Sequence, residues 1–353
     1  MPCCAEAELT HREIYMLNRQ NKSLSRSLLA VFCCAGLALF AQPASAQQDY
    51  PSKPVRFIVP FTPGGGTDIV TRIVAQRLSE TWGKPVVVEN KPGTGGIIAS
   101  QVVANAPPDG YTLNVITPAN VINPSLYTKL PFDPLNDFAA VVLMNRLQLI
   151  IVSAPGFGPN NIRELITLAK SKPGSVNFAS TGTGGAAHLS MELLKKQAGI
   201  DMTHIPYKGS APAYSDVISG QVQILSNNII SSMPLIKGGK LKALAVTGAT
   251  RSVIAPDVPS VAESGLPGFD VTSWFGISVH AKTPRAIIDR LNRDIVKILQ
   301  EPAVREKMIE QGAEPVTGLN TPAAFDQIMR YEMKMWSDLI RSSGIRQEAA
   351  PLQ

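Results

Sequence analysis

The stretch from Val55 to Trp82 reads VRFIVPFTPGGGTDIVTRIVAQRLSETW, which is an apolar strand, a glycine-rich turn and an amphipathic helix in succession. The glycines at 64 to 66 carry no side chain, so backbone N–H groups in this turn can approach a bound group closely. The start of the helix behind them carries roughly half a positive charge. A tight turn alone would explain a single run of this kind, but the combination favours the binding of a small anion.

The same unit occurs a second time, 121 residues further along the chain. The second copy reads VNFASTGTGGAAHLSMELLKKQAG. The aligned pairs are Val55 with Val176, Phe57 with Phe178, Gly64 with Gly185 and Thr67 with His188. A tight strand-to-helix connection could account for one glycine-rich turn, but it accounts less well for two turns at corresponding positions. We therefore predict one anion-binding turn in each of two related lobes.

The first 46 residues have the pattern of a secretory signal peptide. Four basic residues precede an apolar run from Leu28 to Phe40, and Ala44-Ser45-Ala46 then offers the small residues that a signal peptidase cuts. The apolar run is shorter than the ~20 residues that span a bilayer. We predict cleavage after Ala46 and export to the periplasm. Initiation at Met16 would give the leader a conventional length.

Composition narrows the chemistry of the remaining chain. All four cysteines, Cys3, Cys4, Cys33 and Cys34, lie in the leader, so the mature protein has no thiol, disulfide or Cys-metal chemistry. The leader holds four of the 33 Lys and Arg and three of the 27 Asp and Glu, which leaves a formal charge of +5. There is no run of five like charges, so nucleic acid is a poor candidate partner and an anionic ligand a better one.

Short β-branched runs alternate with helical patterns along the mature chain. Such alternation is typical of parallel sheets with helical crossovers, so the predicted fold is α/β, with two lobes of doubly wound, mostly parallel sheet joined by a hinge. The predicted strands are 55–59, 86–89, 112–116, 176–179, 202–206 and 222–225. The first predicted helix carries its apolar face from Ile69 to Leu78, and further helices are predicted over 97–104, 162–172, 188–198 and 211–219. Thr67 or Asp68 is expected to cap the first helix, and Gly83 to end it.

The apolar run from Phe138 to Ser153 is too long for an ordinary strand. We interpret it as a strand that passes from one lobe into the other, with the hinge at the polar break Asn145-Arg146. The predicted division is residues 47–146 for the first part of lobe 1 and 147–247 for lobe 2. Residues 248–353 carry a return strand and C-terminal helices. The sequence leaves open whether 241–247 or 271–281 crosses back.

Ligands of open α/β sheets bind beyond the carboxyl ends of the strands, so the loops there are the candidate site. These loops hold many neutral donors and few catalytic groups, which suits a carboxylate held by hydrogen bonds. The predicted ligand-binding residues are Thr62, Gly64, Gly65, Gly66, Thr67, Asp68, Thr117, Asn120, Thr181, Gly182, Gly185, His188, Tyr207, Lys208 and Asn227. His188 starts a helix, which disfavours its protonation, so we expect a neutral hydrogen-bonding imidazole.

Structural roles compete with binding at several of these positions. Asp68 has an alternative role as a helix cap, Lys208 as a surface lysine and Asn227 as the end of a strand. Trp274 and Phe275 are expected in the core. The segment Gly93–Gly96 is either a plain loop or a flank of the site entrance.

Catalytic and metal-binding motifs are absent from the sequence. Neither GxSxG nor HExxH occurs, and His188, His204 and His280 lack the spacing of metal ligands. We therefore predict no catalytic residues, no metal and no cofactor. A periplasmic hydrolase with a Ser/His/Asp trio drawn from distant loops is the enzyme alternative.

Several motifs together resemble the Bug, or TctC-type, solute-binding proteins of tripartite tricarboxylate transporters. These motifs are PFTPGGGTDIVTR, VVVENKPGTGGI, DGYTL at 109–113, GTGGAAHL at 182–189, HIPYKGSAPA at 204–213, GKLKALAVT and DVTSWFGI. The resemblance runs from Tyr50 to the C-terminus. It implies a monomeric periplasmic protein with the type II binding-protein fold.

The resemblance also implies roles for the loops. The loops Thr62–Asp68 and Thr181–His188 would grip a ligand carboxylate, partly through ordered waters, while Thr117, Asn120, Tyr207 and Asn227 read the other end of the ligand. The partner would be a membrane permease with one large and one small integral subunit. A ligand sensor that signals to a membrane receptor has the same fold and leader, so the sequence leaves this alternative open.

Overall fold

A computed structural model of the chain describes residues 50–343. The predicted signal peptide with its cleavage site lies outside these residues. Within them, no helix combines the length and the apolar character needed to cross a membrane.

The first half of the described chain alternates strands and helices, as the sequence predicts. β1 (Val55–Val59) leads through the glycine-rich turn into α2 (Gly66–Trp82), which ends at Gly83. Gly83 has a φ of 61°, a left-handed conformation that glycine adopts without strain. The elements that follow are β2 (Val86–Asn90), the 3-10 turn η2 (Thr94–Gly96), α3 (Ile97–Ala104), β3 (Thr112–Ile116) and α4 (Pro118–Leu126).

β4 (Phe138–Ser153) is one continuous strand, as predicted from its length. From Phe138 to Gln148 it pairs with β9 (Thr272–His280), and from Leu149 onward it pairs with β7 and β8. The change of partners falls just after Asn145-Arg146. Those two residues pair with β10 (Glu314–Pro315), and their role as a hinge stays a prediction.

The second half repeats the alternation. Its elements are α5 (Ile162–Ser171), β5 (Asn177–Ser180), α6 (Ala186–Ala198), β6 (Thr203–Pro206), α7 (Ser210–Ile218), β7 (Ile224–Asn228), α8 (Ile229–Lys237) and β8 (Lys242–Val246). β7 runs further than predicted, so Asn227 lies in a strand rather than in a loop. The sequence pattern does not indicate α4 and α8, because each contains an internal proline, Pro124 or Pro234, which normally marks the end of a helix.

The strands form one mixed sheet in the order β2-β1-β3-β9-β4-β7-β5-β6, and β8 and β10 also pair with β4. The sets β2-β1-β3 and β6-β5-β7 are each parallel, as predicted. Next to each set lies one antiparallel strand, β9 or β4, that arrives from the other half of the chain. Each lobe therefore contains three parallel strands and one crossing strand, and the strand that returns is β9.

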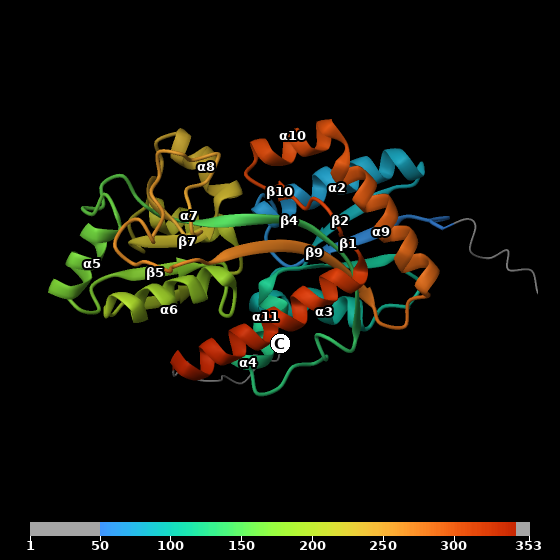
Figure 1. Cartoon of the computed structure of the whole chain (residues 1–353), viewed down its shortest axis with the longest axis horizontal. Helices are drawn as coiled ribbons and strands as arrows, with labels where there is room; N and C mark the ends of the chain where they lie inside the picture. The colour runs from blue at the N-terminus through green and yellow to red at the C-terminus, as the bar shows by residue number, and fades with distance from the viewer. Residues whose placement is uncertain (1–49, 344–353) are drawn as a thin grey trace, which may run out of the picture. The chain divides into compact units, whose positions relative to one another are not determined.

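The C-terminal helices pack on the first half of the chain. They are α9 (Arg285–Gln300), α10 (Pro302–Glu310) and α11 (Pro322–Ser343), and Figure 1 shows α9 beside α2 and α11 across α4. The indole of Trp82 on α2 donates to Asp294 on α9 at 2.8 Å. Arg77, which interrupts the apolar face of α2, pairs with Glu301 at 2.5 Å. An arginine on this face is tolerated because a carboxylate from the returning segment neutralises it.

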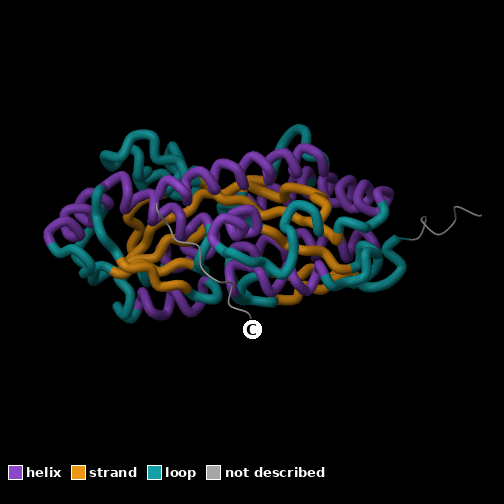
Figure 2. The backbone as a smooth tube through the Cα atoms, turned by 90° about the horizontal axis from the view of Figure 1, so that it is seen from below, coloured by secondary structure: helices purple, strands orange, loops and turns teal. Residues whose placement is uncertain are grey.

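Helices cover both faces of the sheet, as Figure 2 shows. Successive residues of a strand point to opposite faces, so both Phe57 and Ile58 of β1 are buried completely. Phe178, which the repeat aligns with Phe57, is buried in the same way in β5. Burial of each such side chain contributes about 1.5–3 kcal/mol, and this rigid sheet positions the loops at its strand ends.

Candidate functional site

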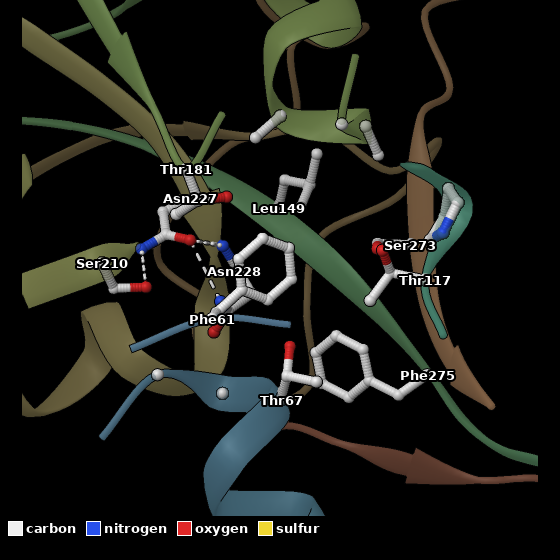
Figure 3. Close-up of a pocket in the computed structure, with 16 residues that line it drawn as sticks. Phe61, Thr67, Thr117, Leu149, Thr181, Ser210, Asn227, Asn228, Ser273 and Phe275 are labelled. Carbon is white, nitrogen blue, oxygen red and sulfur yellow. Dashed lines mark hydrogen bonds between the residues drawn. The ribbon is translucent and has the colours of Figure 1, made fainter. Parts of the chain in front are cut away.

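A pocket lies where the predicted loops meet, and Figure 3 shows the residues around it. The first turns of α2 and α6 reach it from the two lobes, and the crossing strands β4 and β9 also line it. The space open to the centres of water-sized atoms is about 40 Å³, which is enough to admit water or a small polar group. The lining residues are Phe61, Gly65, Gly66, Thr67, Thr117, Pro118, Leu149, Thr181, Gly185, Ala186, Ala187, Ser210, Asn227, Asn228, Ser273 and Phe275.

Both helices that reach the pocket begin without a side-chain cap. The N-cap of α2 is Gly65 (φ −74°, ψ 162°), the N-cap of α6 is Gly185 (φ −81°, ψ 162°), and neither start has a side-chain capping hydrogen bond. The N–H groups of the first helical turn have no partner within the helix. Four of these residues line the pocket, so their N–H groups lie at its border: Gly66, Thr67, Ala186 and Ala187. The pocket is therefore bordered by two helix starts whose donors no side chain caps.

Asp68 stabilises the first turn and does not line the pocket. Its carboxylate accepts hydrogen bonds from the N–H of Gly64 (3.0 Å), from Arg72 (2.9 Å) and from the amide of Asn90 (3.0 Å). Burial alone would raise the pKa of Asp68, but these hydrogen bonds outweigh it and hold the pKa below its usual value. The prediction that Thr67 or Asp68 caps α2 is wrong, because the helix begins earlier, at an N-cap that is glycine.

His188 holds the second turn as Asp68 holds the first. The N–H of Gly184 donates to Nδ1 of His188 at 3.3 Å, so this nitrogen carries no proton. The ring is buried and stacks on His204 with 4.0 Å between the ring centroids. Burial, with a contribution from Lys195, lowers the pKa of His188 to about 4, and burial also lowers the pKa of His204 to about 2. Both imidazoles are neutral at neutral pH, as predicted for His188.

Ser180, the last residue of β5, adds a second support to this turn. Its Oγ lies 2.7 Å from Nε2 of His204, donates to the carbonyl of Gly182 at 3.0 Å and accepts from the N–H of Gly182 at 3.3 Å. Although serine and histidine are adjacent, Ser180 is completely buried and does not line the pocket. The pair shapes the loop rather than presenting a nucleophile to a substrate.

The two turns correspond residue by residue at an offset of 120, one less than predicted. Gly64 (φ 79°) matches Gly184 (φ 82°), and Asp68 matches His188 through equivalent hydrogen bonds. The strands keep the offset of 121, because Phe57 pairs with β3 as Phe178 pairs with β7. The second loop is therefore one residue shorter. The predicted alignment of Thr67 with His188 is wrong, because glycine-rich loops give no unique position for a gap.

Asn227 at the end of β7 positions its neighbours. Its amide donates to Ser210 Oγ and to the hydroxyl of Tyr214, both at 2.9 Å, and its carbonyl accepts from the N–H of Asn228 at 2.8 Å. Figure 3 shows the bonds to Ser210 and Asn228. Asn227 borders the pocket while its amide is already engaged within its own lobe.

Asn120 has a comparable structural role at the start of α4. Its side chain accepts from the N–H of Thr117 at 3.0 Å and donates to Ser100 at 2.8 Å. Thr117 and Asn120 together form a capping box for α4. Thr117 lines the pocket, whereas Asn120 lies behind it and does not.

A second cavity, of about 240 Å³, shares Phe61 and Thr181 with the first. The predicted residues Gly182, Tyr207 and Lys208 line this cavity instead of the first pocket. Its full lining is Phe61, Gly93, Gly95, Tyr127, Thr181, Gly182, Thr183, Pro206, Tyr207 and Lys208. The loop Gly93–Gly96 thus borders the candidate site. Neither lining contains an acidic side chain.

The structure brings most of the predicted site residues together around these two cavities. Those that line the first pocket are Gly65, Gly66, Thr67, Thr117, Thr181, Gly185 and Asn227. Those that line neither cavity are Thr62, Gly64, Asp68, Asn120 and His188. Apart from Thr62, these residues form the hydrogen bonds described above, within or between the loops.

The prediction does not include the residues that the crossing strands contribute. Leu149, Ser273 and Phe275 lie in long buried strands, where nothing in the sequence distinguishes the pocket from the core; Phe275 was expected in the core. Ala186 and Ala187 are not included because α6 was expected to begin two residues later. Phe61 and Ser210 lie in loops that were expected to border the site, although neither residue was itself predicted to bind the ligand.

Glycines bring the loops of the two lobes into close contact. A Cβ atom at Gly66 would collide with the side chain of Asn228, and one at Gly209 would collide with Thr62. A Cβ at Gly95 would lie 2.8 Å from the carbonyl oxygen of Thr183. These positions form a seam between the lobes that has no room for a side chain.

No group of three or more His, Cys, Asp or Glu side chains within residues 50–343 is placed to hold a metal ion. The pocket instead offers uncapped backbone donors and neutral hydroxyl and amide groups.

Comparison with known proteins places the chain in a family. Residues 70–345 match the family model described as "Tripartite tricarboxylate transporter family receptor". The chain is 35% identical to protein BugT of Bordetella pertussis over 326 residues, which cover 92% of this chain and 99% of that protein. Two solved structures are also similar. The periplasmic binding protein BugD has a TM-score of 0.81 and 35% identity, and an R. palustris protein solved with adipate has 0.82 and 34%.

Each of these structural alignments covers 85% of this chain and 100% of the other. The relatives are solute-binding proteins and not enzymes, in agreement with a site that offers donors rather than catalytic groups. With a match over most of its length, the chain belongs to the tripartite tricarboxylate transporter family of receptors.

Proposed function

We propose that this protein captures a small carboxylate between the two glycine-rich turns in the periplasm and delivers it to a membrane permease. The permease of such a system has one large and one small integral subunit. The carboxylate would accept hydrogen bonds from the uncapped N–H groups of α2 and α6, and the hydroxyls of Thr67, Thr117 and Thr181 would complete its surroundings.

The observation that carries this proposal is the pair of uncapped helix starts at one small pocket without acidic side chains. Each helix start stabilises a nearby anion by about 0.3–1 kcal/mol, and more where water is excluded. The pocket between these helix starts admits atoms of water size, and a carboxylate oxygen is of that size. The relative solved with adipate supports the same class of ligand.

The division of donors between two lobes suits a transport receptor. Because each turn supplies only half of the donors, a bound carboxylate stabilises the arrangement in which the turns are close together. A permease can then distinguish the loaded receptor from the empty one by the relative position of the lobes. No covalent step is needed.

The decisive experiment is a thermal-shift screen of carboxylates on the mature protein and on Gly185→Val. A ligand at a hundred times its dissociation constant stabilises the native state by about 2.7 kcal/mol, which corresponds to several degrees in Tm. Gly185 has a negative φ, and a Cβ there meets nothing closer than 3.9 Å. The variant is therefore expected to fold while its side chain occupies the pocket, so that the ligand-induced shift disappears.

Gly158→Val is the matched control, because a Cβ at Gly158 meets no atom within 4 Å and the residue lines neither cavity. This control is expected to keep the ligand-induced shift. Equal shifts in both variants, or no shift of the wild-type protein with any carboxylate, would contradict the proposal. Mass spectrometry of the compound that co-purifies with the protein would identify the ligand.

Export is a separate part of the proposal, supported by the leader pattern and by a family of periplasmic receptors. Cleavage after Ala46 leaves a mature protein that begins at Gln47. N-terminal sequencing of protein from the periplasmic fraction checks this expectation. Soluble periplasmic protein that retains residues 16–46 would contradict it.

A further inference from the structure

The side of β9 that faces away from the first pocket carries a large buried side chain, Trp274. Its two neighbours, Ser273 and Phe275, line the pocket, and Figure 3 shows both there. Because successive residues of a strand point to opposite faces, Trp274 points the other way. It is 1% exposed and makes an edge-to-face contact with Phe325 of α11, with 5.3 Å between the ring centroids. The direction of the two pocket residues therefore depends on where Trp274 is held.

Glu332 of α11 holds Trp274 by a direct hydrogen bond. The indole Nε1–H donates to the carboxylate at 2.7 Å. Glu332 and Phe325 lie two turns apart on the same side of α11, and both contact the same indole. Burial raises the pKa of Glu332, while the hydrogen bond from Trp274 and the charge of Arg146 act in the opposite direction. A carboxylate that is costly to bury is thus committed to the indole.

The strand pairing of β9 is irregular next to the pocket. The pairing of β4 with β9 changes register just before Asn145, which is the partner of Phe275. A bulge of this kind interrupts the ladder of hydrogen bonds and bends the strand. Trp274 itself pairs with Arg146, in the segment predicted as the hinge. The hydrogen bond from α11 therefore anchors β9 beside a bulge and next to the pocket.

We propose that Glu332 is a positioning residue for ligand binding, which holds β9 through Trp274 so that Ser273 and Phe275 face the ligand. Glu332 acts through the strand, since it lines neither cavity. The proposal rests on the proposed function, because it takes the first pocket as the carboxylate site. Loss of the anchor is expected to lower ligand affinity by more than the loss of stability explains.

The experiment removes the hydrogen bond from either side, in Glu332→Leu, in Trp274→Phe and in the double variant, which leaves no buried partner unpaired. The probe is the acid that stabilises the wild-type protein most in the thermal-shift screen, which includes succinate, citrate, aspartate and nicotinate. Calorimetry is expected to show at least about tenfold weaker binding in all three variants, because the strand that borders the pocket is no longer held. The double variant is expected to lose no more than the weaker single variant, as for two partners of one bond.

Glu332→Gln tests whether a conservative replacement restores binding. Glutamine keeps an oxygen that can accept from the indole, so its affinity is expected to stay within about threefold of the wild-type value. Urea midpoints show whether each variant is folded and how much stability it has lost.

Asp294→Leu is the matched control, because Asp294 accepts an indole N–H bond of the same kind from Trp82 at 2.8 Å. Trp82 ends the 17-residue helix α2, whose first residue borders the pocket, so the two ends are about 25 Å apart. This control is expected to lose stability and to keep wild-type affinity. An equal loss of affinity in Asp294→Leu, or wild-type affinity in Glu332→Leu and in the double variant, would overturn the positioning role while the carboxylate receptor stands. If no acid binds the wild-type protein, both proposals fail.

Discussion

The two glycine-rich turns have the same backbone geometry but different chemical supports. In each turn a glycine with φ near 80° donates its N–H to a side chain four residues later, and the next glycine is the N-cap of a helix. In the first turn the acceptor is the ionised Asp68, which Arg72 neutralises. In the second it is the neutral imidazole of His188, stacked on His204.

The difference shows that the backbone, and not a particular side chain, is what both lobes have in common. A carboxylate and an imidazole can each accept the glycine N–H, so either residue can fix the turn. Both solutions also keep uncompensated charge away from the pocket, since Asp68 is paired and His188 is uncharged. The predictions below separate the two supports by their response to protons and to substitution.

The largest expected difference is in acid. The folded-state pKa values of His188 and His204, about 4 and about 2, lie below the usual 6.5, so the unfolded chain binds more protons as the pH falls below 6.5. Between pH 7 and pH 5 this costs about 2 kcal/mol of stability for each imidazole, or about 4 kcal/mol for both. Asp68 loses its contribution only below its unfolded pKa near 3.8, so the first turn is unaffected in this range. Urea unfolding at pH 7 and pH 5 measures the effect.

His204→Gln isolates the contribution of one imidazole. This variant is expected to be less stable at pH 7, yet to lose about half of the pH dependence of the wild-type protein. An unchanged pH dependence would assign the acid sensitivity to other groups.

Asp68→Ala is expected to have the next largest effect. It removes the acceptor of three hydrogen bonds and leaves Arg72 without its carboxylate, which costs about 2 kcal/mol at pH 7. Asp68→Asn retains an oxygen that can accept from Gly64, so its loss is expected to be smaller. Urea midpoints at pH 7 measure both, and equal losses would show that the charge alone stabilises the turn.

Ser180→Ala is expected to have the smallest effect, about 1 kcal/mol, because it removes the hydroxyl that ties the shorter second loop to Gly182. The matching residue of the first lobe is Val59, which has no hydroxyl, so the longer loop manages without this bond. Ser171→Ala, at an exposed serine, is the control. Affinity for a carboxylate that stabilises the wild-type protein in the thermal-shift screen is measured alongside stability, and a wild-type value for both in Ser180→Ala would mean that the hydroxyl does not shape the turn.

The sequence predicted the alternation of strands and helices well, because β-branched runs and glycine stops are local signals. Strand β4 was recognised from its length alone. The identity of the returning strand could not be predicted, since 242–246 and 272–280 have similar apolar patterns and only tertiary pairing separates them. Helices α4 and α8 were hidden by their internal prolines.

The loops of the candidate site were predictable, but the direction of individual side chains was not. Asp68 and His188 were expected at the ligand, and the structure shows both bonded to glycine N–H groups of their own turns. A sequence gives the distance along the chain between Gly64 and Asp68 but not which atom the carboxylate reaches. Leu149 and Ser273 reach the pocket because two strands cross beneath it, which is a property of the topology.

The seam at Gly66, Gly95 and Gly209 makes the missing side chains a condition for the two lobes to meet. A single methyl group added at Gly66 would press on Asn228, and one added at Gly209 would press on Thr62. Alanine at either position is therefore expected to hold the two lobes further apart, so that the two uncapped helix starts no longer approach one carboxylate together. The glycines of this fold thus act twice, because they free backbone donors for the ligand and they let the two halves of the site close.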